Sequence, residues 1–282
     1  MPYSAAISRS NPTCFVFVLD QSGSMGDVFG GGEASLRKAD FLADVANRTL
    51  HDLVIRCTQS DEIRDYFSVS IVGYGSSGGG VSSAFVGRLA GRDSAKISEV
   101  GDSPARLEDR IKKVSDGAGG IVDQTVRFPI WIDPLAEHDT PMCAALKQAK
   151  QIVEQWLRKH PNGYPPVVLH ITDGESTDGD PTTDGNAITG LRSSDGNVLL
   201  FNCHLSSQRA PKIAYPAEAS SLPNDFAKTL FQMSSVVPPE TRKAATGLGM
   251  NLLEASRGFV FNADAASLVQ FFDIGTRPAN LR

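Results

Sequence analysis

Two short apolar runs, each followed by an aspartate, constrain this chain more than any other feature. Residues 14–19 precede Asp20, and residues 167–172 precede Asp173. Largely apolar runs of this length are typical of strands that are covered on both faces. Amphipathic patterns over 34–55 and 141–157 predict a helix after the first run and another before the second. Strands that alternate with helices in this way indicate an α/β protein.

The remaining elements extend the same pattern. Further strands are expected at 67–74, 81–86, 198–204 and 259–262. Further helices are expected at 104–114, after Asp225, near 244–255 and after Asp264, and the run 125–132 is expected to be extended but broken by Pro129. The order predicts a doubly wound, mostly parallel central sheet flanked by helices, with an antiparallel edge strand. We expect residues 1–282 to form a single domain with irregular insertions around 87–138 and 206–223.

Composition limits the classes of binding partner and the cellular compartment that are expected for this chain. The formal net charge is −5, and the 27 basic and 32 acidic residues are interspersed, so neither nucleic acid nor a membrane surface is expected as a partner. Without a signal-peptide pattern or a run of about 18 apolar residues, the chain is expected in the cytoplasm. The four cysteines are far apart and are expected to be reduced core residues.

Polar side chains cluster in the sequence where the first apolar run ends. Asp20, Ser22 and Ser24 offer one carboxylate and two hydroxyls at alternate positions, and Gly23 permits a tight turn between them. Three oxygens can thus face one point, and hard oxygen ligands suit Mg²⁺, Mn²⁺ or Ca²⁺. Taken singly, these residues could equally be turn or capping residues.

This Asp-x-Ser-x-Ser run resembles the metal-ion-dependent adhesion site of von Willebrand factor type A (VWA) domains, which adds a distant threonine and a distant aspartate. Thr140, directly before a helix, and Asp173, at the end of a strand, match those positions. The resemblance implies a VWA or Rossmann-like fold with Ser22, Ser24 and Thr140 as direct hydroxyl ligands of Mg²⁺. Asp20 and Asp173 would act mainly through water or hydrogen bonds. Thr140 taken alone would instead be a helix N-cap, with Pro141 at the first helical position.

Charge balance then suggests what such a site would bind. Two carboxylates neutralise a divalent ion, and neutral hydroxyls leave it able to accept a further anion. We therefore expect a protein partner to supply an Asp or Glu to the metal, with metal and partner each strengthening the other's binding. This expectation makes the chain a non-enzymatic binding module.

The resemblance extends to a narrower group. Segments 140–157, 165–176, 197–206, 231–238 and 257–264 are similar to cytoplasmic bacterial VWA proteins of the tellurium-resistance type (TerY-like). That group is associated with a Ser/Thr protein kinase and a PP2C-type phosphatase. The similarity implies a role in stress-response or defence signalling.

Functions other than a binding module were also considered from the sequence. A metal-dependent hydrolase or phosphatase could use the same ion with His138 or Glu175 as base, and a structural subunit could have lost metal dependence. An aspartyl-phosphate enzyme is disfavoured because Ser22 stands where its second aspartate is needed. The run 75–79 matches Gly-x-Ser-x-Gly, but we expect a hairpin loop there rather than a nucleophile elbow.

Two further segments are expected to lie in loops. The acidic stretch 178–184 lacks the spacing of a calcium loop and is expected to be a solvated loop with a helix cap. The segment 206–223 is expected to be a surface loop, with a lid or docking insertion as the alternative.

Overall fold

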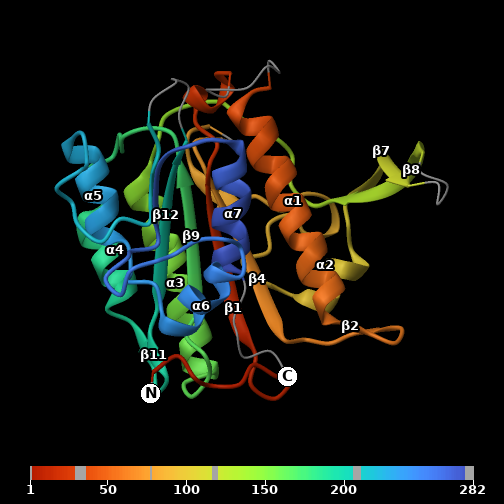
Figure 1. Cartoon of the computed structure of the whole chain (residues 1–282), viewed down its shortest axis with the longest axis horizontal. Helices are drawn as coiled ribbons and strands as arrows, with labels where there is room; N and C mark the ends of the chain where they lie inside the picture. Colours follow the sequence, from red (N-terminus) through yellow and green to blue (C-terminus); the bar gives the residue numbers. More distant parts are fainter. Residues whose placement is uncertain (1, 29–35, 77, 116–119, 206–210, 277–282) are drawn as a thin grey trace.

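A computed structural model describes residues 2–28, 36–76, 78–115, 120–205 and 211–276, and its central feature is an eight-stranded sheet (Figure 1). The strands follow the order β13-β14-β12-β9-β1-β4-β5, and β6 also pairs with β4. The strands of this sheet are β1 (Thr13–Asp20), β4 (Phe67–Tyr74), β5 (Val81–Ser83), β6 (Ala95–Lys96), β9 (Val167–Thr172), β12 (Leu199–Leu205), β13 (Ile213–Ala214) and β14 (Phe259–Ala263). The five strands from β14 to β4 are parallel, whereas β5, β6 and β13 are antiparallel. The predicted mostly parallel sheet with an antiparallel edge is confirmed.

Helices cover both faces of this sheet. Their bounds are α1 (Lys38–Cys57), α2 (Ile97–Asp102), α3 (Met142–Lys159), α4 (Thr182–Thr189), α5 (Asp225–Met233), α6 (Pro239–Thr246) and α7 (Ala265–Gly275), with short 3₁₀ turns η1 (Gly23–Gly26) and η2 (Gly87–Leu89). Figure 1 shows α1 and α7 in front of the sheet and α3 behind it. Three strand pairs of the described residues stand apart from the sheet. Two are short, β2 (Thr58–Gln59) with β3 (Glu62–Ile63) and β10 (Arg192–Ser193) with β11 (Gly196–Asn197), and the third is the longer pair of β7 (Arg106–Ser115) with β8 (Ile121–Ile130).

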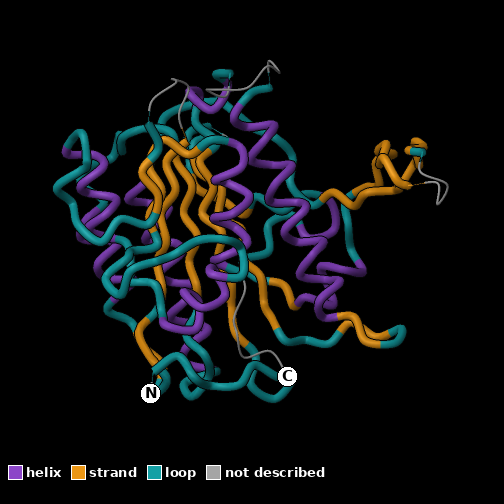
Figure 2. The backbone as a smooth tube through the Cα atoms, in the orientation of Figure 1, coloured by secondary structure: helices purple, strands orange, loops and turns teal. Residues whose placement is uncertain are grey.

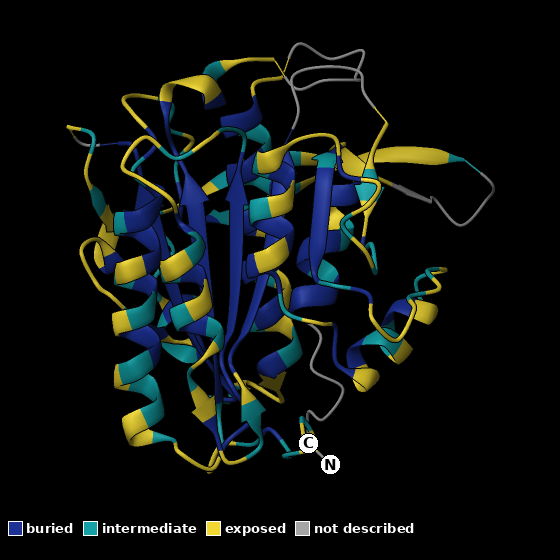
Figure 3. Ribbon diagram, turned by 90° about the vertical axis from the view of Figure 1, so that its left-hand side faces the viewer, coloured by how far each residue is buried: buried dark blue, intermediate teal, exposed yellow. Residues whose placement is uncertain are grey.

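The pleat of β1 divides the core into two layers. Phe15, Phe17 and Leu19 join the cluster that contains residues of α1 and α7, while Val16 and Val18 join the cluster with α3 and α5. Successive side chains of a strand point to opposite faces, so a strand buried on both sides is expected to be mostly apolar. Figure 3 shows these central strands buried beneath helices whose outer surfaces are exposed. This explains why the two apolar runs in the sequence locate β1 and β9 correctly.

The sheet reverses its winding beside β1. The chain passes from β1 through α1 to β4 on one side, and later through α3 to β9 on the other side of β1. Helices that leave on opposite faces open a crevice outside the carboxyl ends of the two strands, where ligands of doubly wound folds bind. Asp20 ends β1, and Asp173 directly follows β9, so both candidate residues lie at this switch point.

The helix predicted at 104–114 is wrong, because this segment forms the strand β7 (Arg106–Ser115). It pairs antiparallel with β8 (Ile121–Ile130) over ten positions. Leu107 and Ile111 are spaced by four and fit a helical face, but pairing with a β-branched partner strand decides the outcome. The hairpin projects away from the sheet (Figure 2).

Smaller boundary predictions also change. The helix expected near 244–255 begins at Pro239 and ends at Thr246, because proline suits the first helical turn and Gly247 and Gly249 follow the last one. The strand expected at 81–86 is shorter and ends at Ser83. Of the segment 206–223, residues 206–210 lie outside the described part, and Ile213–Ala214 adds the edge strand β13.

Two expectations from composition can be compared with the structure. The four cysteines are free and buried, as predicted. In the described part of the chain, none of the helices combines the length and apolar character needed to cross a membrane.

Candidate metal centre

The turn after β1 brings two hydroxyl groups together at the carboxyl edge of the sheet. The Oγ atoms of Ser22 and Ser24 lie 3.2 Å apart, and the Ser24 hydroxyl donates to Oδ1 of Asp173 at 2.6 Å. Ser22 is buried, whereas Ser24 is exposed, so the pair lies between the core and the surface. With Asp20, which accepts from the backbone N–H of Ser22, four of the five predicted site residues are linked by direct hydrogen-bond contacts.

Asp20 lies beneath this pair and is almost fully buried. Its Oδ1 accepts from the backbone N–H of Ser22 at 2.9 Å, and its Oδ2 accepts from the Thr172 hydroxyl at 2.8 Å. Burial raises the pKa of Asp20 to about 6, and the nearby charge of Asp173 adds to this rise, while the hydrogen bonds from Ser22 and Thr172 oppose it. A divalent cation is the kind of group that would offset this cost of ionisation.

Asp173 is held on both oxygens. While Oδ1 accepts from Ser24, Oδ2 accepts from the ammonium group of Lys38 at 2.5 Å. The Lys38 side chain is only 2% exposed and that of Asp173 is fully buried, so this is a buried ion pair. Lys38 therefore adds one positive charge to the centre. The charge balance made from the sequence counted only the two aspartates and the divalent ion.

Thr140 lies in the loop before α3, and the structure gives its side chain no direct bond to the other four predicted site residues. The alternative interpretation of Thr140 as the N-cap of this helix is wrong. The N-cap of α3 is Pro141, without a side-chain capping bond, and the helix begins at Met142. The carboxylate of Asp178 caps the helix instead, accepting from the N–H groups of Cys143 and Ala144 at 2.9 Å each. Thr140 is buried, and its backbone exchanges hydrogen bonds with Thr177 at 3.0 and 3.1 Å.

Two glycines allow this loop to pack on the turn after β1. The N–H of Gly23 donates to the carbonyl of His138 at 2.9 Å, and a Cβ at Gly23 would lie 2.5 Å from the carbonyl oxygen of Glu137. Gly75 has φ +93°, and a Cβ there would lie 2.6 Å from the Asp139 carbonyl and 2.8 Å from Cα of Ser22. The close approach of these three segments therefore requires glycine at both positions.

Lys38 and Thr172 are the polar contacts that the sequence did not reveal. Lys38 stands at the first position of α1, beside the apolar stripe, where a lysine ordinarily faces solvent. Thr172 reads simply as the last residue of a strand. The only available signal for Thr172 was its place directly before Asp173, at the edge where parallel strands end.

The residues around the candidate centre can be compared with the alternative functions that the sequence suggests. His138 and Glu175 are both exposed, and the rim also carries the exposed Asp139. After β4 the chain returns as the antiparallel strand β5, with no helix between them, so the nucleophile elbow is not formed; Ser77 itself lies outside the described residues. The acidic stretch supplies helix caps, with Asp178 on α3 and Asp180 bonded to Thr182 at the start of α4.

Two observations separate this centre from other kinds of site. Within the described ranges, no group of three or more His, Cys, Asp or Glu side chains is placed to hold a metal, and the candidate centre combines two carboxylates with hydroxyls instead. A cavity of about 680 Å³ lies at the opposite end of the strands, lined in part by Cys14, Phe67 and Trp156. The candidate centre is therefore not part of that cavity.

Comparisons with known proteins add little to this description. Neither the protein families nor the curated proteins compared contain a match. Among solved structures, proximal thread matrix protein 1 from the mussel byssus is similar with a TM-score of 0.45 and 10% identity. The alignment covers 96% of this chain and 48% of the mussel protein, so this chain spans about half the length of its neighbour. A likeness at this level carries no argument about function.

Proposed function

We propose that this chain is a metal-dependent protein-binding module, whose ion is completed by a carboxylate from a partner. The observation that carries the proposal is the convergence of Ser22, Ser24 and Asp173 at the switch point of the sheet, with Oγ atoms 3.2 Å apart and an Oγ–Oδ1 distance of 2.6 Å. Ser22, Ser24 and Thr140 would hold the metal directly, and Asp20 and Asp173 would hold it through water. Mg²⁺ fits this set of oxygen donors, and Mn²⁺ or Ca²⁺ are acceptable substitutes.

Lys38 strengthens the case for an anionic partner. Asp20 and Asp173 contribute two negative charges, Lys38 contributes one positive charge, and a divalent ion adds two more, which leaves a net charge of +1. One carboxylate from a partner would neutralise this charge. Because the exposed rim residues Asp139 and Glu175 are acidic, a partner carboxylate would be repelled when the ion is missing. Binding should therefore depend strictly on the metal.

The site favours binding over hydrolysis. A hydrolase needs a base close to the metal-bound water, and the two candidate bases, His138 and Glu175, are exposed rim residues. The main-chain carbonyl of His138 is engaged with Gly23, which gives this residue a structural role in the loop. By resemblance to the tellurium-resistance group, we further propose a cytoplasmic role with a Ser/Thr kinase and a PP2C-type phosphatase as associated proteins.

Metal binding by the chain alone is the first test. Titration with Mn²⁺, followed by water proton relaxation, should show one site in the wild type and a large loss of affinity in Ser24→Ala. Ser83→Ala is a matched control, because Ser83 is partly buried in the edge strand β5 and its hydroxyl donates to the Arg92 carbonyl rather than to a residue of the candidate centre. Equal Mn²⁺ affinity in both variants would reject the proposed centre.

Partner capture is the second test. The wild type and Ser24→Ala are immobilised and exposed to lysate of the native host, with Mg²⁺ or with EDTA. We expect a protein that is retained only by the wild type with Mg²⁺ and is released by free glutamate at high concentration. Retention that is unchanged in EDTA would reject metal-dependent binding. Hydrolysis of a phosphate ester that disappears in Glu175→Gln would instead favour a hydrolase.

A further inference from the structure

The β7–β8 hairpin is an arm with unused pairing capacity. Within the described residues, β7 and β8 pair with each other over ten positions and with no other strand. A hairpin of two strands is marginally stable on its own, and its free edges can pair with another strand. This arm also exposes apolar side chains that a folded chain usually covers, namely Leu107 (44%), Ile111 (71%), Ile121 (74%) and Val122 (47%).

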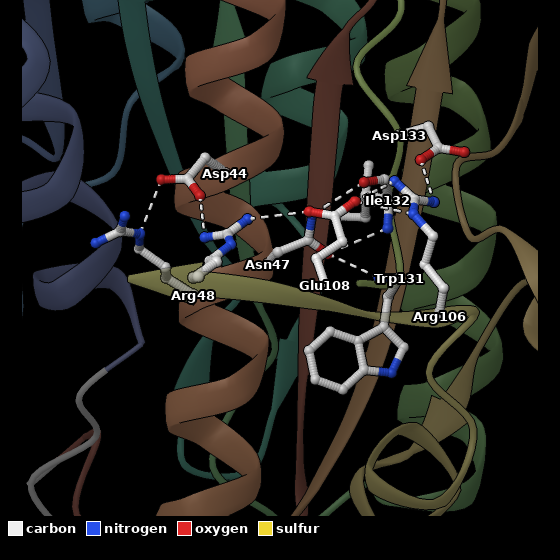
Figure 4. Close-up of polar contacts among 9 residues, drawn as sticks. Asp44, Asn47, Arg48, Arg106, Glu108, Trp131, Ile132 and Asp133 are labelled. Atoms are coloured by element: carbon white, nitrogen blue, oxygen red, sulfur yellow. Dashed lines mark hydrogen bonds and ion pairs between the residues drawn. The ribbon is translucent and has the colours of Figure 1, made fainter. Parts of the chain in front are cut away.

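The root of the arm is fixed to the body. Arg110 forms an ion pair with Asp44 of α1 at 2.5 Å, and its guanidinium lies 3.9 Å from the centre of the Phe128 ring. Arg106 pairs with Asp133 at 2.6 Å, next to the contacts between Asn47 and the backbone that follows β8 (Figure 4). The outer part of the arm therefore projects from an anchored base rather than from a loose loop (Figure 1).

The sequence of β8 is complementary to itself. When identical strands pair antiparallel about a twofold axis, one residue lies opposite its own copy. With Thr125 at that position, Asp123 lies opposite Arg127 twice, and Val122 lies opposite Phe128. This register contains no pair of like charges. Opposite charges on facing strands stabilise the pairing, whereas like charges weaken it.

The strand β7 does not have this property. Centring a self-pairing on any charged residue of β7 places a like charge opposite itself, and centring it on Ile111 places Arg110 opposite Lys112. Leu107 and Val114 avoid this, but each lies one residue from an end of the strand and would pair only three of its residues. Charge therefore selects β8 as the edge for a second copy.

The pairing of β7 with β8 within one arm extends the alternation of opposite charges to four strands. Within one arm, Asp123 lies opposite Lys113, and Arg127 lies opposite Asp109. Adding a second copy in the register above would produce rows whose charges alternate in sign across all four strands, in the order Lys113, Asp123, Arg127 of the second copy and Asp109 of the second copy. The exposed edge would then be covered and the sheet would have four strands.

We propose that two copies of this chain associate through their arms, by antiparallel pairing of β8 with β8 about Thr125. The small interface predicts a weak dimer that forms as concentration rises and weakens with added salt. This inference is independent of the metal centre, which lies at the carboxyl edge of the main sheet.

Two charge-swapped variants test the register without disturbing the arm itself. Asp109→Arg with Arg127→Asp, and Lys113→Asp with Asp123→Lys, each keep opposite charges within the hairpin but put like charges between copies. By sedimentation velocity, each variant alone should dimerise about ten-fold more weakly than the wild type, while an equimolar mixture should regain association. A wild type that stays monomeric at all concentrations, or a mixture that fails to associate, overturns the proposal.

Cross-linking places the axis independently. The four native cysteines are buried, so Thr125→Cys introduces an exposed thiol that would face its own copy. Mild oxidation should give a disulfide-linked dimer. The control Ile111→Cys is also exposed, but on β7 it would lie about 14 Å from its copy, three strand spacings away, which is too far for a disulfide. Equal cross-linking of both variants overturns the proposed register.

Discussion

Lys38 donates from its ammonium group to Asp173 at 2.5 Å, although the two residues are 135 positions apart in the chain. The pair joins the start of α1 to the end of β9 across the candidate metal centre. A buried charge that loses its partner is strongly destabilising, unless another cation replaces it. The ion pair therefore links folding stability to the charge of the centre.

Replacing Lys38 by Met should make stability depend on metal. Without metal, the variant should lose about 3 kcal/mol in the free energy of unfolding, because Asp173 is left buried and unpaired. Saturating Mg²⁺ should restore most of this loss, and Mn²⁺ affinity should rise because a positive charge has been removed. Urea unfolding with Mg²⁺ and with EDTA measures the effect.

The matched control for this experiment is Lys228→Met. Lys228 pairs with the almost fully exposed Asp225 at 3.0 Å, and a surface pair of this kind contributes little to stability. A Lys38→Met protein that is equally unstable with and without Mg²⁺ would contradict the link between this ion pair and the metal.

Gly75→Ala should damage the centre without altering any ligand. Its Cβ would strike the Asp139 carbonyl and the backbone of Ser22, so the segments that carry Ser22 and Thr140 must separate. Gly78→Ala is the control, because Gly78 also has a positive φ but has open space around its Cβ position. Both variants should lose about 1–2 kcal/mol of stability from backbone strain. Only Gly75→Ala should lower Mn²⁺ affinity, by about ten-fold or more; equal affinities would show that the close packing is unimportant.

Asp178→Ala should loosen the start of α3. Its carboxylate caps two N–H groups across more than thirty residues, so its loss should cost about 1–2 kcal/mol and speed hydrogen exchange at Cys143 and Ala144. Asp180→Ala removes a bond to Thr182 within the same loop and should leave exchange at those two amides unchanged. Exchange measured by NMR distinguishes the two variants, and equal rates would argue against a capping role for Asp178.

The buried His170 predicts a loss of stability in mild acid. Burial lowers its pKa to about 4, although a hydrogen bond to Asn202 opposes this shift, and its Nε2 lies 2.9 Å from the Tyr74 hydroxyl. The unfolded chain binds a proton near pH 6.5, whereas the folded chain does not until about pH 4. The contribution of the neutral ring is therefore complete above about pH 6.5 and is lost as the pH falls towards 4.

The variant His170→Gln isolates the contribution of His170 to the pH dependence of stability. The difference in unfolding free energy between wild type and variant should shrink by about 3 kcal/mol from pH 7 to pH 4, because groups shared by both proteins cancel. A difference that stays constant over this range would show that His170 does not titrate as its burial requires.

The parts of the fold that could be predicted from the sequence are those decided by burial on both faces. The strands β4 and β9 match the predicted bounds 67–74 and 167–172. The alternation of Phe67, Val69 and Ile71 marks the first, and a mostly apolar run of the kind expected for a covered parallel strand marks the second. Of the arm, only the extended run 125–132 was predicted; it overlaps β8, which continues through Pro129 to Ile130 instead of breaking there. Its strands are largely exposed, so no burial pattern marks them, and their form depends on pairing between residues up to 24 positions apart, such as Arg106 with Ile130.

The candidate metal centre also has one part that could be predicted from the sequence and one part that could not. Asp20, Ser22 and Ser24 are close in the chain, so their convergence follows from one local turn, and Asp173 follows from its place at the end of a parallel strand. Lys38 could not be foreseen, because its direction depends on how α1 lies over the edge of the sheet. The capping of α3 by Asp178 depends likewise on the meeting of two distant loops.

The helix α3 spans the molecule from one end of the sheet to the other. Its 18 residues extend about 27 Å, from the loop that carries Thr140 to the wall of the 680 Å³ cavity, where Trp156 and His160 stack with ring centres 4.0 Å apart. Asp178 ties the first turn of the helix to the loop after β9. A shift of α3 along its axis would have to break these bonds, and it would displace the wall of the cavity together with the loop that carries Thr140.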